Sequence, residues 1–271
     1  MTERGTCWCG ATAAVDHVRG CSIRPDGVRV SFSVVLCAAC GTGRTVPPPV
    51  ADYSATPLAE NDRARQLPLW RTFAAESLAL VRRYRPQGRL LDVGCNIGVL
   101  VAAAARAGYA ASGIDPDQTA VAYGCQQFGL ALSTQATTAL PAAAYDVVML
   151  EQTLEHVMEP LLLLRELSRL LSPGGIIAVS VPRYQGLVPR LTGAAWYGWW
   201  PWEHRWHFSD GGLRLAAVRA GLTVAGLHRC RLYHEPVWRT RSGVLTGIAD
   251  MAAAVVPVLG DKIFMVVRKE E

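Results

Sequence analysis

The sequence predicts an α/β protein in which a doubly wound, mostly parallel sheet follows a small cysteine-rich module. Two observations predict this fold. Short apolar strands alternate with helical segments from about residue 89 onward, as in parallel sheets with helices on both faces. Two closely spaced cysteine pairs precede this region, within the first 40 residues. At 271 residues, the chain is long enough for one large domain and a small additional one.

The first strand of the predicted sheet ends in a glycine turn. Its sequence pattern is Asp92-x-Gly94-x-Asn96-x-Gly98. Residues 90–93 suit a strand buried on both faces, and the two glycines allow the backbone to approach a ligand closely. Asp115 follows at the end of a second apolar strand, where a carboxylate can accept hydrogen bonds from both hydroxyls of a ribose. The combination of turn and acid predicts a nucleotide-type ligand.

This turn resembles the D-x-G-x-G-x-G motif of the class I, Rossmann-like methyltransferases that use S-adenosylmethionine (SAM), with Asn96 at the middle glycine. Asparagine tolerates a left-handed backbone well, whereas the G-x-G-x-x-G pattern of nicotinamide-binding proteins fits poorly. Gln135 stands in the loop where the family often has an acid that meets the adenine. The resemblance implies SAM as the cofactor, with these residues expected to bind it: Asp92, Gly94, Asn96, Gly98, Asp115, Gln135 and Glu151.

The two cysteine pairs have a spacing that is typical of metal ligands. Cys7-x-Cys9-Gly and Cys37-x-x-Cys40-Gly bracket a predicted strand over residues 28–36. Four thiolates held in glycine turns suit one tetrahedral, structural zinc ion, and a module of about 40 residues rarely folds without such a cross-link. The first pair is one residue shorter than the usual C-x-x-C. Four unrelated buried thiols are the alternative interpretation, and Cys21 could replace Cys7 or Cys9 as a ligand.

Further segments follow the same family pattern, and the resemblance implies a mostly parallel, seven-stranded sheet. Residues 145–150 resemble its fourth strand, residues 170–175 its turn before the fifth strand, and residues 262–268 its antiparallel last strand. Periodicity and turn residues predict helices over residues 61–84, 99–107, 117–128 and 160–171, and strands over 90–93, 110–114, 130–133, 145–150, 176–181 and 262–268. We expect a zinc-ribbon-like module over residues 1–46, a linker over 47–66 and the methyltransferase domain over 67–271, with an aromatic lid insert over 183–210.

Acidic and histidine residues follow the fourth strand, at the edge of the sheet where ligands bind. If this segment is helical, Glu151 and Glu155 lie at positions i and i+4 with His156 alongside. The Glu-x-x-x-Glu-His spacing resembles the ubiquinone-pathway O-methyltransferases, in which it is associated with a divalent metal. Such a catalytic metal is one interpretation of these three residues. The other is that His156 alone removes the acceptor's proton, or only packs beside the cofactor.

The insert after the fifth strand is rich in aromatic residues. Five of the eight tryptophans lie between Trp196 and Trp206. They are expected to form a wall of the acceptor site or, alternatively, a lid packed on its own core. His207 lies in the same insert and could supply a second base or a further metal ligand. The predicted catalytic residues are therefore His156, His207 and Glu155.

These patterns predict a SAM-dependent methyltransferase that acts on a small-molecule acceptor in a natural-product, sugar or quinone pathway. Oxygen is the expected acceptor atom, with carbon or nitrogen as alternatives. An RNA methyltransferase and a non-catalytic SAM-binding protein are the competing functions. No run of five basic residues indicates a nucleic-acid arm, despite a net charge of +5. No signal peptide is recognisable, and the apolar stretch over residues 244–260 is interrupted by Asp250 and Pro257, so we expect a cytoplasmic protein without a membrane span.

Overall fold

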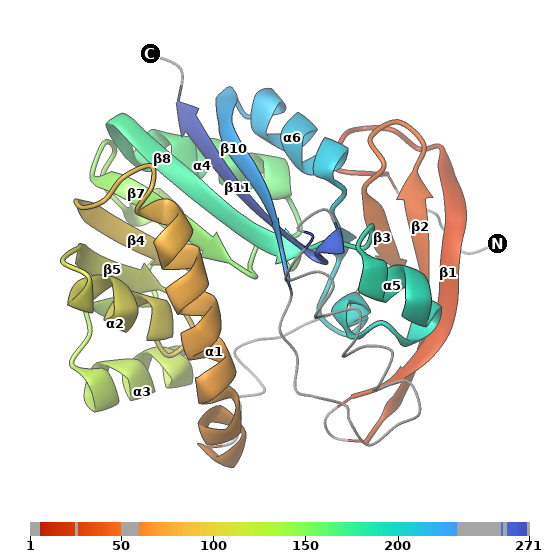
Figure 1. The fold of residues 1–271 in the computed structure, drawn as a ribbon, viewed down its shortest axis with the longest axis horizontal. Helices are drawn as coiled ribbons and strands as arrows, with labels where there is room; N and C mark the ends of the chain where they lie inside the picture. Colours follow the sequence, from red (N-terminus) through yellow and green to blue (C-terminus); the bar gives the residue numbers. More distant parts are fainter. Residues whose placement is uncertain (1–5, 25–26, 50–59, 232–255, 257–258, 270–271) are drawn as a thin grey trace.

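A computed structural model of the protein describes residues 6–24, 27–49, 60–231, 256 and 259–269. In these residues the larger sheet has seven strands in the order β10-β11-β8-β7-β4-β5-β6. The strands are β4 (Arg89–Val93), β5 (Ala110–Ile114), β6 (Leu132–Ser133), β7 (Tyr145–Glu151), β8 (Leu171–Pro182), β10 (Leu222–Cys230) and β11 (Lys262–Lys269). β11 runs antiparallel to both of its neighbours, while the pairs from β8 to β6 are parallel. The predicted doubly wound, mostly parallel sheet is confirmed (Figure 1).

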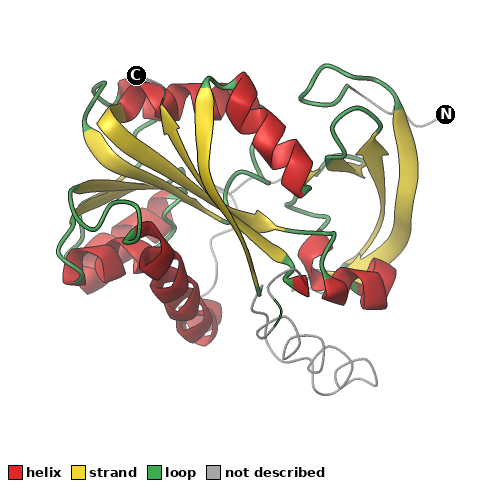
Figure 2. Ribbon diagram, turned by 45° about the horizontal axis from the view of Figure 1, so that its top comes forward, coloured by secondary structure: helices red, strands yellow, loops and turns green. Residues whose placement is uncertain are grey.

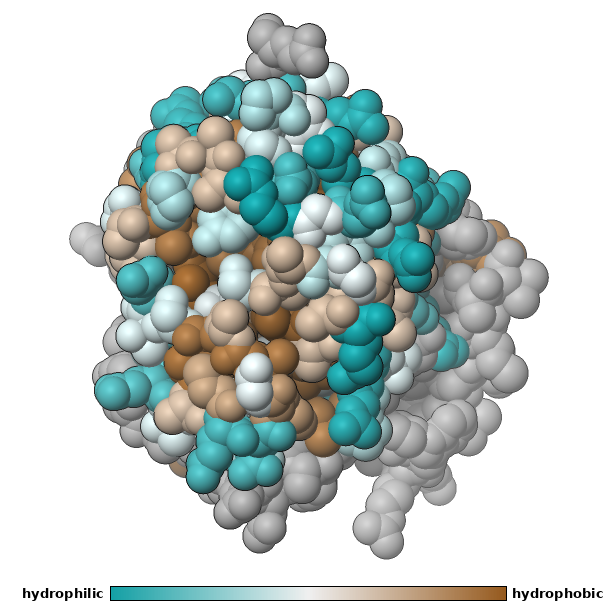
Figure 3. Space-filling view, turned by 90° about the vertical axis from the view of Figure 1, so that its left-hand side faces the viewer, coloured by the Kyte–Doolittle hydropathy of each residue, from teal (hydrophilic) through white to brown (hydrophobic). Residues whose placement is uncertain are grey.

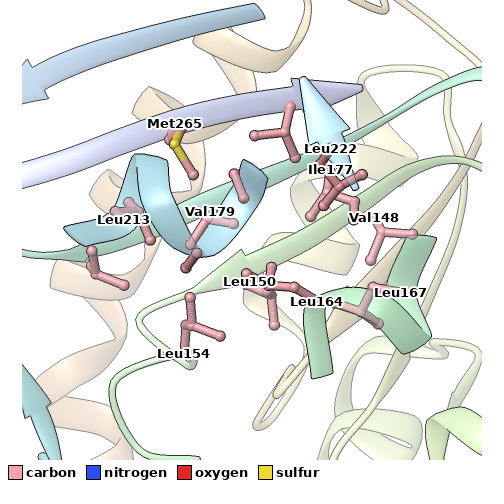
Figure 4. Close-up of a cluster of buried hydrophobic side chains, with 14 of the residues drawn as sticks. Val148, Leu150, Leu154, Leu164, Leu167, Ile177, Val179, Leu213, Leu222 and Met265 are labelled. Carbon is pink, nitrogen blue, oxygen red and sulfur yellow. The ribbon is translucent and has the colours of Figure 1, made fainter. Parts of the chain in front are cut away.

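Helices cover both faces of this sheet (Figure 2). On one side lie α1 (Glu60–Val81), α2 (Val99–Arg106) and α3 (Gln118–Phe128), and on the other lie α4 (Pro160–Leu170) and α6 (Asp210–Arg219). Successive residues of β7 explain the two cores, because side chains alternate across a strand. Val147 and Met149 pack with α1 and α2, whereas Val148 and Leu150 pack with α4 and α6, a cluster that Figure 4 shows in detail.

The N-terminal module forms a second, antiparallel sheet of four strands in the described residues. Its order is β1 (Ala14–Ile23), β2 (Arg29–Cys37), β3 (Gly43–Val46) and β9 (Trp206–His207). β9 belongs to the aromatic insert, so the insert and the N-terminal module share one sheet. Between β8 and β9 the insert also contains α5 (Leu187–Thr192) and two short 3-10 helices, Gly193–Ala195 and Tyr197–Trp199.

A third core joins the insert to the N-terminal sheet. Trp196 and Trp199 are each 2% exposed and pack with Phe32 and Val34 of β2 and with Phe73 of α1. The insert therefore packs against two other parts of the chain. It does not form a core of its own.

Several element ends differ from the sequence prediction. The predicted strand over residues 28–36 is confirmed as β2, and the helix over 61–84 ends earlier, at Val81. Residues 171–175 continue the strand β8, where the sequence predicted a helix end and a turn. Half of the predicted linker, residues 50–59, and most of the apolar stretch over 244–260 lie outside the described residues.

The surface helices expose some large apolar side chains, among them Leu162 of α4 and Val218 of α6. On the side of the molecule where α2 and α3 lie, hydrophilic and hydrophobic patches share the face (Figure 3). No helix among the described residues is both long and apolar enough to cross a membrane.

Candidate active site and cysteine cluster

The glycine turn after β4 adopts the left-handed backbone that its sequence predicts. The φ angles of Gly94, Asn96 and Gly98 are 79°, 49° and 80°. Asn96 stabilises its own conformation, because its side-chain oxygen accepts a hydrogen bond from the amide of Ile97 at 2.8 Å. Asparagine thus occupies the middle glycine position of the motif at little cost.

Asp115 lies against this turn. Its two carboxylate oxygens accept hydrogen bonds from the backbone amides of Asn96 and Asp117, each at 2.8 Å. A carboxylate oxygen has two lone pairs, so both oxygens can still accept a hydrogen bond from a ligand hydroxyl. Burial raises the pKa of Asp115, and the two amide hydrogen bonds oppose that shift.

Three carboxyl groups surround the turn. Asp92 is 2% exposed, and burial together with the neighbouring Glu151 and Asp115 raises its pKa well above the usual range. Burial also raises the pKa of Glu151, while the positive charge of Lys262 lowers it. Among the described residues, Asp92 Oδ1 and Glu151 Oε2 have no hydrogen-bond partner. Such a cluster favours a ligand that brings positive charge or hydrogen-bond donors.

The segment after β7 is a turn. The conditional prediction of a helix over Glu151 to His156 is wrong. Gln152 has a left-handed φ of 52°, and the Thr153 hydroxyl shares its one proton between the carbonyl oxygens of Val93 at 3.1 Å and Glu151 at 3.2 Å. These bonds fold the segment back onto the glycine turn, and Glu151 Oε1 instead accepts from the hydroxyl of Ser180 at 2.9 Å. Glu151 and Glu155 therefore do not form an i, i+4 pair.

Glu155 and His156 meet a histidine of the insert. Their ligand atoms and one from His204 all lie within 4.8 Å of one another. Glu155 is fully buried, and the rings of His156 and His204 meet edge to face with centroids 4.7 Å apart. Burial lowers the pKa of His156 to about 4, so its imidazole is neutral at physiological pH, and the same shift makes it a weaker base than a free histidine.

The sequence did not single out His204. It stands three residues before His207 in the same aromatic segment, and nothing in the spacing favours one over the other. His207 lies in β9, where its Nε2 is 2.8 Å from the Thr45 hydroxyl and its ring packs edge to face against Trp199. Gln135, expected near the adenine, is exposed in the loop after β6.

The four predicted zinc ligands come together. The sulfur atoms of Cys7 and Cys40 are 3.7 Å apart and those of Cys9 and Cys37 are 3.6 Å apart. All four lie within 4.8 Å of one another, whereas Cys21 is exposed in β1, outside this cluster. The hydrogen bond from the Cys7 thiol lowers the pKa of Cys40 to about 4, so this cluster stabilises a thiolate.

Glycines shape both cysteine turns. The amides of Gly10 and Gly41 donate to the carbonyl oxygens of Cys7 and Cys37, at 2.8 and 2.9 Å. Both glycines have a left-handed φ, of 88° and 70°, which explains why a glycine follows each cysteine pair.

The sheet order, the antiparallel β11 and the glycine turn followed by Asp115 define a class I, SAM-dependent methyltransferase fold. Comparison with known proteins agrees. The family described as "Methyltransferase domain" matches residues 59–226, and the chain belongs to this family.

Curated relatives are named as ubiquinone biosynthesis O-methyltransferases. The protein from Caulobacter vibrioides is 34% identical over 149 residues, which is 50% of this chain and 59% of that protein. The one from Aeromonas salmonicida is 38% identical over 101 residues, 34% of this chain and 42% of that protein. The chain thus spans about half the length of the curated relatives it matches.

Solved structures share the fold at low identity. A chain from the complex of the Haloferax volcanii Trm112 methyltransferase activator and the putative methyltransferase has a TM-score of 0.62 at 18% identity, covering 82% of this chain and 100% of that one. Burkholderia thailandensis 1,6-didemethyltoxoflavin-N1-methyltransferase, bound to its acceptor and S-adenosylhomocysteine, has a TM-score of 0.55 at 15% identity, with coverage of 94% and 100%.

Proposed function

We propose that this protein transfers the methyl group of SAM to a hydroxyl oxygen of a small-molecule acceptor, in a quinone, sugar or natural-product pathway of the cytoplasm. The carboxyl cluster at the glycine turn carries the proposal. SAM has a sulfonium and an ammonium group, and the buried oxygens of Asp92 and Glu151 would face this positive charge. Asp115 would hold the ribose. The names of the curated relatives favour oxygen as the acceptor atom.

The chemistry needs little more than positioning and one base. A bond forms between the acceptor oxygen and the methyl carbon, the bond from that carbon to the sulfonium breaks, and S-adenosylhomocysteine leaves without protonation. The acceptor hydroxyl loses its proton to His156, whose imidazole is neutral at physiological pH because of burial. The turn after β7 holds His156 through the bonds of Thr153 to the glycine turn.

Replacement of His156 tests this role. His156→Ala should lower kcat about 10²- to 10⁴-fold while calorimetry shows an unchanged affinity for SAM. Full activity in this variant would show that His156 is not the base. Catalysis would then rest only on the positioning of the two reactants, as for an acceptor that is already ionised. His207→Ala should show the same loss only if both histidines serve one site.

A divalent metal is the second version of this site. One carboxylate and two imidazoles are a suitable donor set, and here Glu155, His156 and His204 supply it. Such a metal would lower the pKa of the acceptor hydroxyl when bound. A rate that is lost on chelation and restored by magnesium or zinc, while the cysteine cluster keeps its own metal, would favour this version; zinc is the sharper probe, because imidazole ligands suit it better than magnesium. We expect neither ion to change the rate.

We also propose that the cysteine cluster holds one structural zinc ion. A tetrahedral ion with Zn–S bonds of about 2.3 Å places its sulfur atoms about 3.8 Å apart. The two closest sulfur pairs, at 3.7 and 3.6 Å, fit this spacing. Four thiolates complete the coordination, so zinc here would stabilise the fold and take no part in the reaction.

A further inference from the structure

The strand β9 is tied to two parts of the molecule. On one side it pairs with β3 of the N-terminal sheet. On the other, the backbone amides of Arg205 and Trp206 both donate to the carbonyl oxygen of Glu155, at 2.9 and 3.0 Å. The indole of Trp206 also donates to the carbonyl oxygen of Val157 at 2.9 Å. The insert therefore connects the cysteine module directly to the turn that carries Glu155 and His156.

Thr45 lies at the centre of this connection and is 2% exposed. Its amide donates to the carbonyl oxygen of Arg205 at 3.1 Å, and its hydroxyl donates to the carbonyl oxygen of His204 at 2.7 Å. A hydroxyl has one proton and a carbonyl can only accept. The 2.8 Å contact with His207 is therefore a hydrogen bond from the His207 Nε2–H to the Thr45 oxygen. The Thr45 side chain thus holds the backbone of His204 and fixes the tautomer of His207.

The same logic gives the tautomer of His204. Its Nδ1 is 3.0 Å from the carbonyl oxygen of Gly198, so Nδ1 carries the proton and Nε2 offers a lone pair. Nε2 is 4.0 Å from a carboxyl oxygen of Glu155. Among the described residues, neither carboxyl oxygen of Glu155 has a hydrogen-bond partner.

We propose that His204 is a positioning residue for Glu155 and His156, and that the cysteine module holds it in place through Thr45. His204 stands between the two, with its lone pair toward the Glu155 carboxyl and its ring against the edge of His156. The proposal rests on the proposed function, in which His156 takes the acceptor's proton. It makes the N-terminal module a structural part of the active site.

Two matched substitutions of His204 separate a role in positioning Glu155 and His156 from a role in folding. In His204→Asn the amide can still donate to Gly198 from near the Nδ1 position, but nothing faces Glu155. In His204→Gln the amide reaches the Nε2 position and still offers a hydrogen-bonding group to the Glu155 carboxyl. We expect His204→Asn to lower kcat about 10²-fold and His204→Gln less than about tenfold, with SAM affinity unchanged in both. Higher activity in the Asn variant than in the Gln variant would overturn the positioning role.

The connection from the cysteine module through Thr45 to the turn after β7 is tested separately, by amide hydrogen exchange. Thr45→Val removes the hydroxyl and Thr45→Ser keeps it. Hydrogen exchange of the Arg205 and Trp206 amides, which bind the Glu155 carbonyl, should be faster in the valine variant and in protein stripped of zinc, and should stay slow in the serine variant. Valine should also lower kcat about tenfold or more. Slow exchange and full activity in Thr45→Val would overturn the link.

His156→Ala shows which proposal fails. If that variant loses activity while His204→Asn and Thr45→Val keep theirs, the inference about His204 is wrong and the proposed function stands. If His156→Ala is fully active, the proposed base is wrong, and the inference falls with it.

Discussion

Replacing Gly94 with alanine should destabilise the protein and, by distorting the glycine turn, weaken SAM binding. Two separate costs contribute to the loss of stability. The first is backbone strain, because a φ of 79° costs a residue with a Cβ about 1–2 kcal/mol. The second is a collision, because a Cβ at this position would lie 2.5 Å from Thr153 Oγ1 and 2.7 Å from its Cγ2. Moving Thr153 away would break its hydrogen bond to Val93, at about 0.5–1.5 kcal/mol.

The two costs together predict a loss of about 1.5–3.5 kcal/mol in the free energy of unfolding of Gly94→Ala. Urea denaturation measures this loss, and calorimetry measures SAM binding. The control is the same substitution in a Thr153→Ala background, where the two closest contacts are absent and only the contact to the Cβ of residue 153, at 3.2 Å, remains. There Gly94→Ala should cost little more than the strain of about 1–2 kcal/mol. An equal cost in both backgrounds would show that Gly94 and Thr153 are not coupled, and would refute the packing of the turn after β7 on the glycine turn.

Three further predictions address the cofactor, the buried histidines and the metal. Asp115→Ala should weaken SAM binding by about 2 kcal/mol in calorimetry, through lost ribose contacts, and unchanged affinity would argue against the ribose site. His207 is 2% exposed and burial lowers its pKa to about 3. Its folded-state pKa lies below the unfolded value of about 6.5, so its contribution to stability is complete above pH 6.5 and is lost as the pH falls, at about 1.4 kcal/mol per pH unit. His207→Gln should flatten the pH dependence of urea denaturation below pH 6.5 relative to the unsubstituted protein, and identical curves would contradict the buried neutral state. Elemental analysis of protein purified without chelator should find one zinc per chain, lost in Cys40→Ala, and a value below about 0.2 would remove zinc from the account.

Local patterns predicted six of the seven strands of the large sheet, because these strands are apolar and separated by clear turns; β10 was not predicted. Local patterns also predicted the backbone of the glycine turn, since Asn96 takes the left-handed conformation that its residue type favours. The turn after β7 shows the limit. Its residues fit a helix by spacing, but the hydrogen bond of Thr153 to Val93, sixty positions away in the sequence, folds the segment back.

Long-range pairing also explains what the sequence could not indicate in the rest of the site. β9 has only two residues and exists because β3, more than 150 positions earlier, pairs with it. His204 reaches Glu155 through that pairing, so no local pattern could distinguish it from His207. β1 escaped prediction because most of its side chains are exposed and it lacks a continuous apolar face.

Transfer of an isotopically labelled methyl group tests the central claim most directly. The protein is incubated with SAM that carries a trideuterated methyl group, in parallel with a panel of phenols, catechols and sugar nucleotides and with total RNA, and the products are analysed by mass spectrometry. The account predicts label on a hydroxyl oxygen of a small molecule, with transfer reduced at subsaturating SAM in Asp115→Ala and at saturating SAM in His156→Ala. Label in RNA and in none of the small molecules would contradict it.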